Sequence, residues 1–129
     1  MSTGNPLRHN CDRDGCWNLT ERPPIHEFHD CFPRGINFGD IDAAVEINGR
    51  ILYVEWKRDG ADIPHGQRLL HDRLVARGDT VIVVRWRVQI GNIVGFLIRH
   101  GTSNQDNDGD TESLKVRMRG WVRWAETHP

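Results

Sequence analysis

The sequence predicts an α/β fold in which a mixed central β-sheet is flanked by helices. Two alternating segments joined by Asn48-Gly49 predict a β-hairpin. A helical pattern over residues 63–77, followed by a β-branched segment, predicts a crossover to a parallel strand. A second amphipathic pattern near the C-terminus predicts another helix against the sheet. The length fits one compact domain spanning residues 1–129, with residues 38–100 as its core.

The two strands of the hairpin are predicted at residues 41–47 and 50–57. Both residues of a two-residue hairpin turn need positive φ, which asparagine and glycine tolerate. With such a turn, the register places Asp42 directly opposite Glu55. The apolar side of the hairpin, which we expect to be buried, comprises Ile41, Ala43, Val45, Leu52, Val54 and Trp56.

The next elements are predicted from signals at their ends. The helix over residues 63–77 has Pro64 in its first turn, and Gly78 supplies its stop. Residues 80–88 form a β-branched run and predict a buried strand, and residues 93–99 predict one more strand.

The C-terminal part combines a polar stretch with an amphipathic helix. Residues 101–110 are polar and acidic and are predicted to be a linker. The helix is predicted over residues 111–126, with apolar residues at helical spacing. These are Leu114, Met118, Trp121, Val122 and Ala125.

Composition and charge narrow the classes of protein. The 17 basic and 18 acidic residues leave a net charge of −1, which argues against coating nucleic acid through bulk charge. No apolar run is long enough to span a bilayer, and residues 1–10 lack the apolar stretch of a secretory signal. The three cysteines are an odd number and do not predict a disulfide framework. We therefore expect a cytoplasmic protein without a membrane partner.

The hairpin register gathers charged side chains on one face. Asp42 lies opposite Glu55, and Asp40 lies opposite Lys57. Directly opposed carboxylates destabilise a sheet, so either one is protonated or a cation lies between them. Mg²⁺ prefers such oxygen ligands, and a metal ion with a nearby lysine suits attack on a phosphodiester. The alternative is a solvated strand end on which Asp40 pairs with Lys57.

These residues resemble the PD-(D/E)xK nuclease superfamily, in its VRR-NUC and Holliday-junction-resolvase-like branch. In that superfamily an Asp on one strand and a Glu-x-Lys on the next form the catalytic core. Short phage-encoded proteins of this type are also similar in the segment from Cys31 to Gly35. The resemblance covers roughly residues 31–86 and is carried by Gly78 and five segments: residues 31–35, 39–42, 55–57, 66–67 and 81–85.

The resemblance implies a restriction-endonuclease-like core and hydrolysis of a DNA phosphodiester that leaves a 5′-phosphate. Asp42 and Glu55 would hold Mg²⁺ or Mn²⁺, helped by the backbone carbonyl of Trp56. Lys57 would position or activate the attacking water. Gln67 would support the site from the following helix, orienting a metal-bound water or the lysine. The residue before Asp42 is not the family's usual proline.

The N-terminal segment, residues 1–37, is rich in Cys and His and is predicted to be mostly loops with short elements. Four of its side chains could bind a structural zinc ion, although free cysteines and surface histidines are the more common outcome. The resemblance also leaves open whether Glu21 or Glu27 supplies the upstream helical acid found in some relatives. The candidate zinc ligands are Cys11, Cys16, His29 and Cys31.

Basic side chains on the last predicted helix could track a phosphate backbone, with Trp124 stacking on a base. A solvated helix face is the alternative. Arg85 and Arg87 are similar candidates, and a general-base role for His65 or His71 is conceivable. The residues of the basic stripe are Lys115, Arg117, Arg119 and Arg123.

The sequence therefore favours a Mg²⁺-dependent nuclease that acts on DNA. Branched, flapped and single-stranded DNA are the candidate substrates. Because the net charge is so small, we expect shape-selective binding or assistance from a homodimer. If the protein is phage-encoded, it would act in the host-cell cytoplasm. One competing function is a catalytically silent nuclease-fold protein that binds nucleic acid or a host protein. The other is a small zinc-stapled interaction module.

Overall fold

The computed structural model describes residues 25–36, 38–39 and 41–129. The chain divides into two compact units, residues 1–40 and residues 41–129. Each unit is described by itself.

The described part of the first unit is a short helix followed by turns. The 3₁₀-helix η1 spans Ile25–Cys31. The ring of Phe38 meets the rings of Phe28 and Phe32 edge-on, at centroid distances of 6.4 and 5.1 Å. Edge-to-face contacts of this kind are a favoured arrangement of aromatic pairs.

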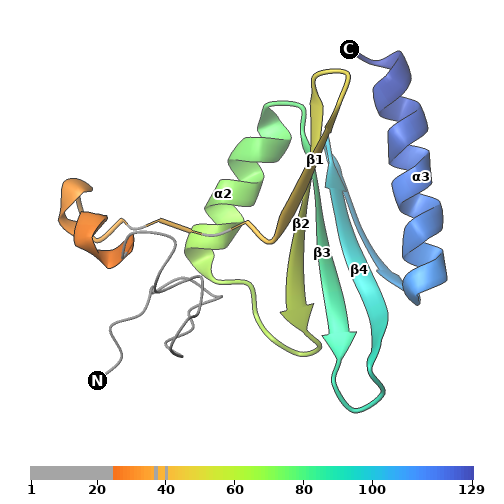
Figure 1. Ribbon diagram of the computed structural model, residues 1–129, viewed down its shortest axis with the longest axis horizontal. Helices are drawn as coiled ribbons and strands as arrows, with labels where there is room; N and C mark the ends of the chain where they lie inside the picture. The colour runs from red at the N-terminus through yellow and green to blue at the C-terminus, as the bar shows by residue number, and fades with distance from the viewer. Residues whose placement is uncertain (1–24, 37, 40) are drawn as a thin grey trace, which may run out of the picture. The chain divides into compact units, whose positions relative to one another are not determined.

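The second unit is a five-stranded mixed sheet with one helix on each face (Figure 1). The strands lie in the order β1-β2-β3-β4-β5; β2 and β3 are parallel, and the other neighbours are antiparallel. The predicted α/β class, with a mixed sheet and flanking helices, is confirmed. The elements are β1 (Ala43–Ile47), β2 (Arg50–Arg58), α2 (His65–Ala76), β3 (Thr80–Arg87), β4 (Asn92–His100), β5 (Ser103–Asp108) and α3 (Thr111–Thr127).

The hairpin β1–β2 has the predicted register. Its turn residues Asn48 and Gly49 have φ values of 57° and 86°, as a two-residue turn requires. Ile47 pairs with Arg50, and the pairing continues without a shift to Ala43 and Val54. Because side chains alternate between the two faces of a strand, this register decides which residues of β2 meet α2 and which meet α3.

Each face of the sheet is buried beneath one helix. On one face, Leu52 and Val54 of β2 pack with Leu114, Trp121 and Ala125 of α3. On the other face, the buried residues belong to β3 and α2, with partly buried neighbours from β2 and β4 around them. The buried residues of this second cluster are Val75, Val81 and Val83.

The expectation that the whole apolar side of the hairpin is buried is wrong. Leu52 and Val54 are buried, but Ala43, Val45 and Trp56 are exposed, as is Ile41 just before β1. The physical reason is that β1 is an edge strand. The helix α3 packs on the central strands β2, β3 and β4, and only Ile47 of β1 contacts the same cluster.

The prediction of a linker over residues 101–110 is also wrong, because most of this stretch is the edge strand β5. It pairs antiparallel with β4 along its whole length, from His100 opposite Ser103 to Gly95 opposite Asp108. Its side chains are mostly exposed, so no apolar alternation marks it in the sequence. The other predicted helices and strands end within two residues of the observed ones.

We predict that Asn48 stabilises the fold in two separable ways. It adopts positive φ in the turn, and its Nδ2 donates to the carbonyls of Ala125 and Glu126 at the end of α3, at 3.0 and 3.3 Å. Asn48→Gly keeps the turn and loses these bonds, which should lower the free energy of unfolding by about 1 kcal/mol. Asn48→Ala should lose about 1 kcal/mol more because alanine is strained at positive φ. Urea unfolding measures both, and equal losses would contradict the role of positive φ.

Candidate active site

The strand β2 carries the acid and the lysine of the predicted site to the face that α2 covers. Glu55 and Lys57 alternate with Leu52 and Val54, so they lie on the opposite side of the sheet from α3. Glu55 is only 3% exposed and pairs in register with the buried Val83. A carboxylate is seldom buried this deeply unless it is paired, because removing it from water costs several kcal/mol.

An amide and an ammonium group contact the side chain of Glu55. Gln67 Nε2 donates a hydrogen bond to Glu55 Oε1 at 3.0 Å, and Lys57 Nζ lies 3.7 Å from the same oxygen. The Lys57 side chain is 12% exposed, so solvent still reaches part of it. The structure therefore brings together three of the predicted site residues, Glu55, Lys57 and Gln67.

The other end of the Gln67 amide has no partner within the described part of the chain. Its Oε1 is buried and accepts no hydrogen bond there. An unsatisfied buried acceptor costs about 1–3 kcal/mol, and such groups are uncommon in native proteins. A water molecule or another donor beside Glu55 would satisfy this oxygen.

Asp42 reaches the same stretch of β2 from the start of the hairpin. It directly precedes β1, and its Oδ2 accepts a hydrogen bond from the backbone N–H of Trp56 at 2.7 Å. The carboxylate thus accepts a hydrogen bond at the end of the hairpin ladder. Its donor, Trp56, lies between Glu55 and Lys57 in the sequence. Asp40, the predicted alternative partner of Lys57, lies outside the described residues.

A buried histidine adjoins these residues on α2. His71 follows Gln67 by one helical turn, so the two side chains share a face of α2. Burial lowers the pKa of His71, and the positive charges of Arg99 and Lys57 lower it further against the opposing effect of Asp72. The imidazole is therefore neutral at pH 7.

A cleft of about 210 Å³ opens beside Lys57, and its charges are mixed. Arg68 from α2 and Lys57 supply positive charge there, and Asp62 and Asp106 supply negative charge. The cleft also includes Arg85, which is paired with Asp106. Phosphate binding in this cleft would therefore depend on Lys57 and Arg68.

The arginines of β3 have carboxylate partners. Besides Asp106, Arg85 lies within ion-pair distance of Asp59 and Asp108, at 3.8 and 3.5 Å. Arg87 pairs with Asp59 at 2.7 Å. Both arginines, which were predicted to contact nucleic acid, thus already form ion pairs with neighbouring carboxylates.

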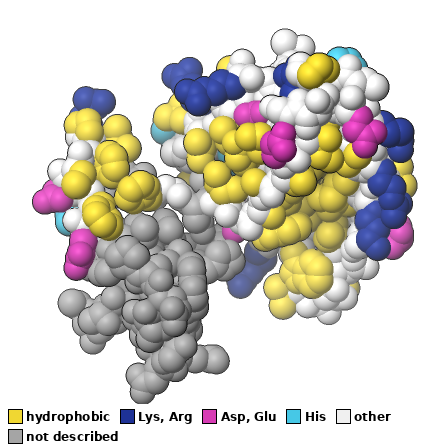
Figure 2. All heavy atoms as spheres, turned by 45° about the horizontal axis from the view of Figure 1, so that its top comes forward, with side chains coloured by type: hydrophobic (Ala, Val, Ile, Leu, Met, Phe, Trp, Pro, Cys, Tyr) yellow, Lys and Arg dark blue, Asp and Glu magenta, His cyan; other side chains and the backbone are white. Residues whose placement is uncertain are grey.

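The basic stripe of α3 is not brought to the same place as Glu55 and Lys57. Figure 2 shows Lys and Arg side chains gathered along the side of the molecule that α3 forms, and α3 covers the other face of the sheet. Lys115 pairs with Glu112 at 3.3 Å, and Arg117 donates to Gln105 and Asn107 at 3.1 and 3.2 Å. Arg119 and Arg123 are exposed on the same helix.

Trp124, predicted to stack on a base, already has aromatic and cationic neighbours. Its ring stacks on that of His128 at 4.9 Å and meets His100 edge-on at 4.4 Å. The guanidinium of Arg50 lies 5.0 Å from the ring centroid, at a distance typical of a cation–π contact. Through its contact with Arg50, Trp124 therefore connects the end of α3 to the start of β2.

The predicted zinc site is only partly within the described residues. Cys11, Cys16 and Glu21 lie outside them, and Cys31 carries an exposed free thiol. His29 and Glu27 belong to η1 in the first unit. Across residues 25–36, 38–39 and 41–129, no group of three or more His, Cys, Asp or Glu side chains is arranged to hold a metal ion. A site with two carboxylates, such as the one predicted here, is smaller than that.

The sequence reasoning missed an exposed aromatic and basic surface at the end of β2 and β3. Trp56 and Trp86 are each 43% exposed, and Arg58 pairs in register with Trp86. Because side chains alternate between the faces of a strand, these three lie on the α3 side of the sheet, near the ends of β2 and β3 and close in sequence to Lys57. The repeated tryptophan and arginine near the ends of two neighbouring strands is the signal that would have indicated this surface.

Comparisons with protein-family models, with curated proteins and with solved structures found no match to this chain. No helix in the part of the chain that the structure describes is long and apolar enough to cross a membrane.

We predict that His71 makes the fold less stable in mild acid. Its pKa is lowered in the folded state, so below about pH 6.5, the ordinary histidine pKa, the unfolded chain binds the proton more readily. Its contribution to stability is complete above that pH and is lost as the pH falls toward the folded pKa. Urea unfolding at pH 7.5 and pH 5.0 should show a smaller drop for His71→Gln than for the wild type. His65→Gln, at an exposed position of α2, is the control and should retain the wild-type drop; an unchanged drop in His71→Gln would contradict this role.

Proposed function

We propose that this protein is a nuclease that uses Mg²⁺ or Mn²⁺ to hydrolyse phosphodiester bonds in DNA, built on a restriction-endonuclease-like core of the PD-(D/E)xK type. The observation that carries the proposal is the group formed by Glu55, Lys57 and Gln67. A buried carboxylate, a lysine beside it and a glutamine bonded to it match the chemistry of that type of site.

The residues present fit a hard divalent cation. Oxygen ligands are what Mg²⁺ prefers, typically one or two carboxylates completed by waters and substrate phosphate oxygens. The buried Gln67 Oε1, which accepts no hydrogen bond from any described residue, supports the presence of a further donor beside Glu55. Asp42, Glu55 and the carbonyl of Trp56 would hold the ion. A bound ion would polarise the phosphoryl oxygen and lower the pKa of the attacking water.

Lys57 would act on the attacking water or on a phosphate oxygen. Its position near Glu55 Oε1 limits the directions in which the ammonium points, and its partial exposure leaves it accessible to substrate. Gln67 would be a positioning residue, because its amide holds the Glu55 carboxylate in one orientation. Arg68 would hold the DNA backbone in the adjoining cleft.

The exposed side chains favour a substrate with unpaired bases. Trp56 and Trp86 offer faces on which bases stack, and Arg58 lies beside Trp86 to meet a phosphate. With a net charge of −1, the protein has little bulk attraction for duplex DNA. Single-stranded, flapped or branched DNA is therefore the proposed substrate class.

A silent member of the same fold is the second candidate. The observation that favours it is the engagement of Asp42 Oδ2 by the Trp56 amide, which gives this carboxylate a structural role without a metal ion. Such a protein would bind nucleic acid or a host protein and would not cleave DNA.

Loss of the charge of Glu55 or of Lys57 should abolish cleavage. With Mn²⁺ and a panel of single-stranded, flap, four-way-junction and duplex DNA, Glu55→Gln and Lys57→Ala should each reduce cleavage at least a hundredfold, as should a chelator. Asp42→Asn should behave likewise. Glu126→Gln and Arg73→Ala are controls at exposed positions and should cleave as the wild type does. Wild-type cleavage by both β2 variants would overturn the assignment.

Metal binding should be measurable without activity. Mn²⁺ at ten times its dissociation constant should stabilise the wild type by about 1.4 kcal/mol and raise the melting temperature by a few degrees. Glu55→Gln should lose this rise, and Glu126→Gln should keep it. A rise that persists in Glu55→Gln would show that the ion binds elsewhere. A rise without cleavage of any substrate would favour the silent alternative.

A further inference from the structure

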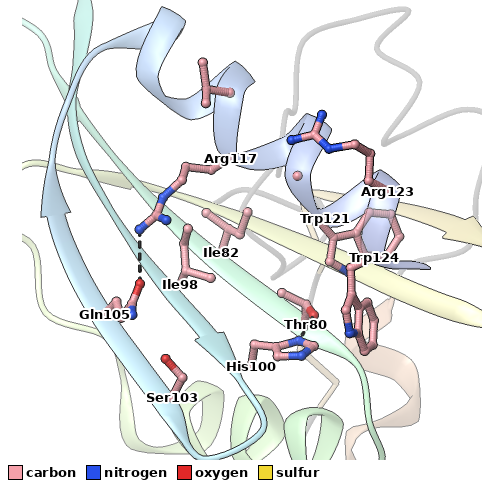
Figure 3. A pocket seen from close by; sticks show the side chains of 12 residues that line it. Thr80, Ile82, Ile98, His100, Ser103, Gln105, Arg117, Trp121, Arg123 and Trp124 are labelled. Carbon is pink, nitrogen blue, oxygen red and sulfur yellow. Dashed lines mark hydrogen bonds between the residues drawn. The ribbon is translucent and has the colours of Figure 1, made fainter. Parts of the chain in front are cut away.

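A groove of about 450 Å³ lies between α3 and the strands β3, β4 and β5, on the face of the sheet away from Glu55 and Lys57 (Figure 3). Its floor and wall are apolar, formed by Ile82, Ile98 and Trp121. Its volume falls within the range of small-molecule sites, which is about 300–1,000 Å³.

One residue that lines the groove carries a buried donor that has no acceptor in the part of the chain that the structure describes. Trp121 is only 7% exposed, and its indole N–H finds no hydrogen-bond partner among the described residues. Buried tryptophan N–H groups usually have such a partner, because leaving one unpaired costs about 1–3 kcal/mol. A ligand that offers an acceptor at this wall would remove the cost.

The wall of the groove also contains a glycine in the middle of a helix. Gly120 lies within α3, where glycine costs about 1 kcal/mol relative to alanine. Close packing does not require it: apart from the neighbouring helix backbone, the nearest described atom to an added Cβ would be Nη2 of Arg123, at 3.7 Å. The glycine therefore keeps the groove wider at a cost to the helix.

The rim of the groove is cationic and polar. Arg117 and Arg123 project from α3, and the bond from Arg117 to Gln105 holds its guanidinium toward β5 at 3.1 Å. Each guanidinium has five N–H donors, so Arg117 keeps donors to spare after its bonds to Gln105 and Asn107. His100 lines the groove on the side of β4.

We propose that this groove binds a nucleotide, with the base against the apolar wall and the phosphate at Arg117 and Arg123. A nucleobase has apolar faces for Ile82 and Ile98, and acceptors on its edge for the Trp121 N–H. The phosphate matches the geometry of arginine donors. The same chemistry is presented by a free nucleotide and by an unpaired nucleotide within a DNA strand. The proposal does not rest on the proposed nuclease function, because the groove lies on the opposite face of the sheet.

The test is binding of dTMP, dAMP and a 12-nucleotide single strand to the full chain in EDTA, where metal-dependent cleavage is stopped. Titration calorimetry gives affinity, and the indole N–H signal of Trp121, assigned with Trp121→Phe, should shift on binding. Gly120→Leu fills the groove and should weaken binding at least tenfold. Arg123→Gln should weaken it several-fold, and Arg73→Gln, an exposed arginine of α2, should leave it unchanged.

Gly120→Ala distinguishes loss of binding from loss of the fold. It should raise the unfolding midpoint, because alanine favours the helix, and should still weaken binding several-fold. Binding of the mononucleotides supports a small-molecule site, and binding of the strand alone supports capture of an unpaired nucleotide. Two results would overturn the proposal: no binding of any probe at millimolar concentration, or binding that survives both Gly120→Ala and Arg123→Gln. A third would be binding of dodecanoate, a fatty acid with an apolar chain and a carboxylate, in place of the nucleotides.

Discussion

The hairpin turn at Asn48-Gly49 is the constraint on which the arrangement of the second unit depends. A slip of one residue would send every side chain of one strand to the other face. The observed register instead places Glu55 and Lys57 beneath α2 and places Leu52 and Val54 beneath α3. The same turn fixes the start of β1, from which Asp42 reaches the backbone of Trp56.

Alternation in the central strands gives the domain two chemically different faces. The α2 face contains a carboxylate, an ammonium and an amide within a largely apolar layer. The α3 face is apolar at its centre and basic along the helix. The packed sheet separates Glu55 and Lys57 from the groove beside α3, so a ligand within that groove does not contact these two residues. The proposed phosphodiester chemistry and the proposed nucleotide groove are therefore independent sites.

The fold was largely predictable because its main signals are local. The Asn48-Gly49 turn, the β-branched run of β3 and the stop at Gly78 each specify a backbone conformation or a period. The strand β5 was not predictable in this way, because an exposed edge strand has no apolar alternation and is specified by its pairing with β4. The exposure of Val45 likewise depends on how far α3 extends across the sheet.

The grouping of Glu55 and Lys57 was predictable from strand alternation, and Gln67 from the resemblance to a known family. The backbone bond made by Asp42 was not, because the residue lies just outside the strand that alternation describes. The separation of the basic stripe from these residues depends on which face α3 covers. Periodicity identifies the apolar side of a helix and not the sheet face against which it packs.

The acidic side chains of β5 affect how the sheet behaves at high protein concentration. An unpaired strand edge is a template for another chain, and charged residues on that edge oppose such addition. Asp106 and Asp108 place carboxylates along β5, and Asp106 is also held by Arg85. This border of the sheet is thus protected against edge-to-edge aggregation by the same residues that neutralise an arginine of β3.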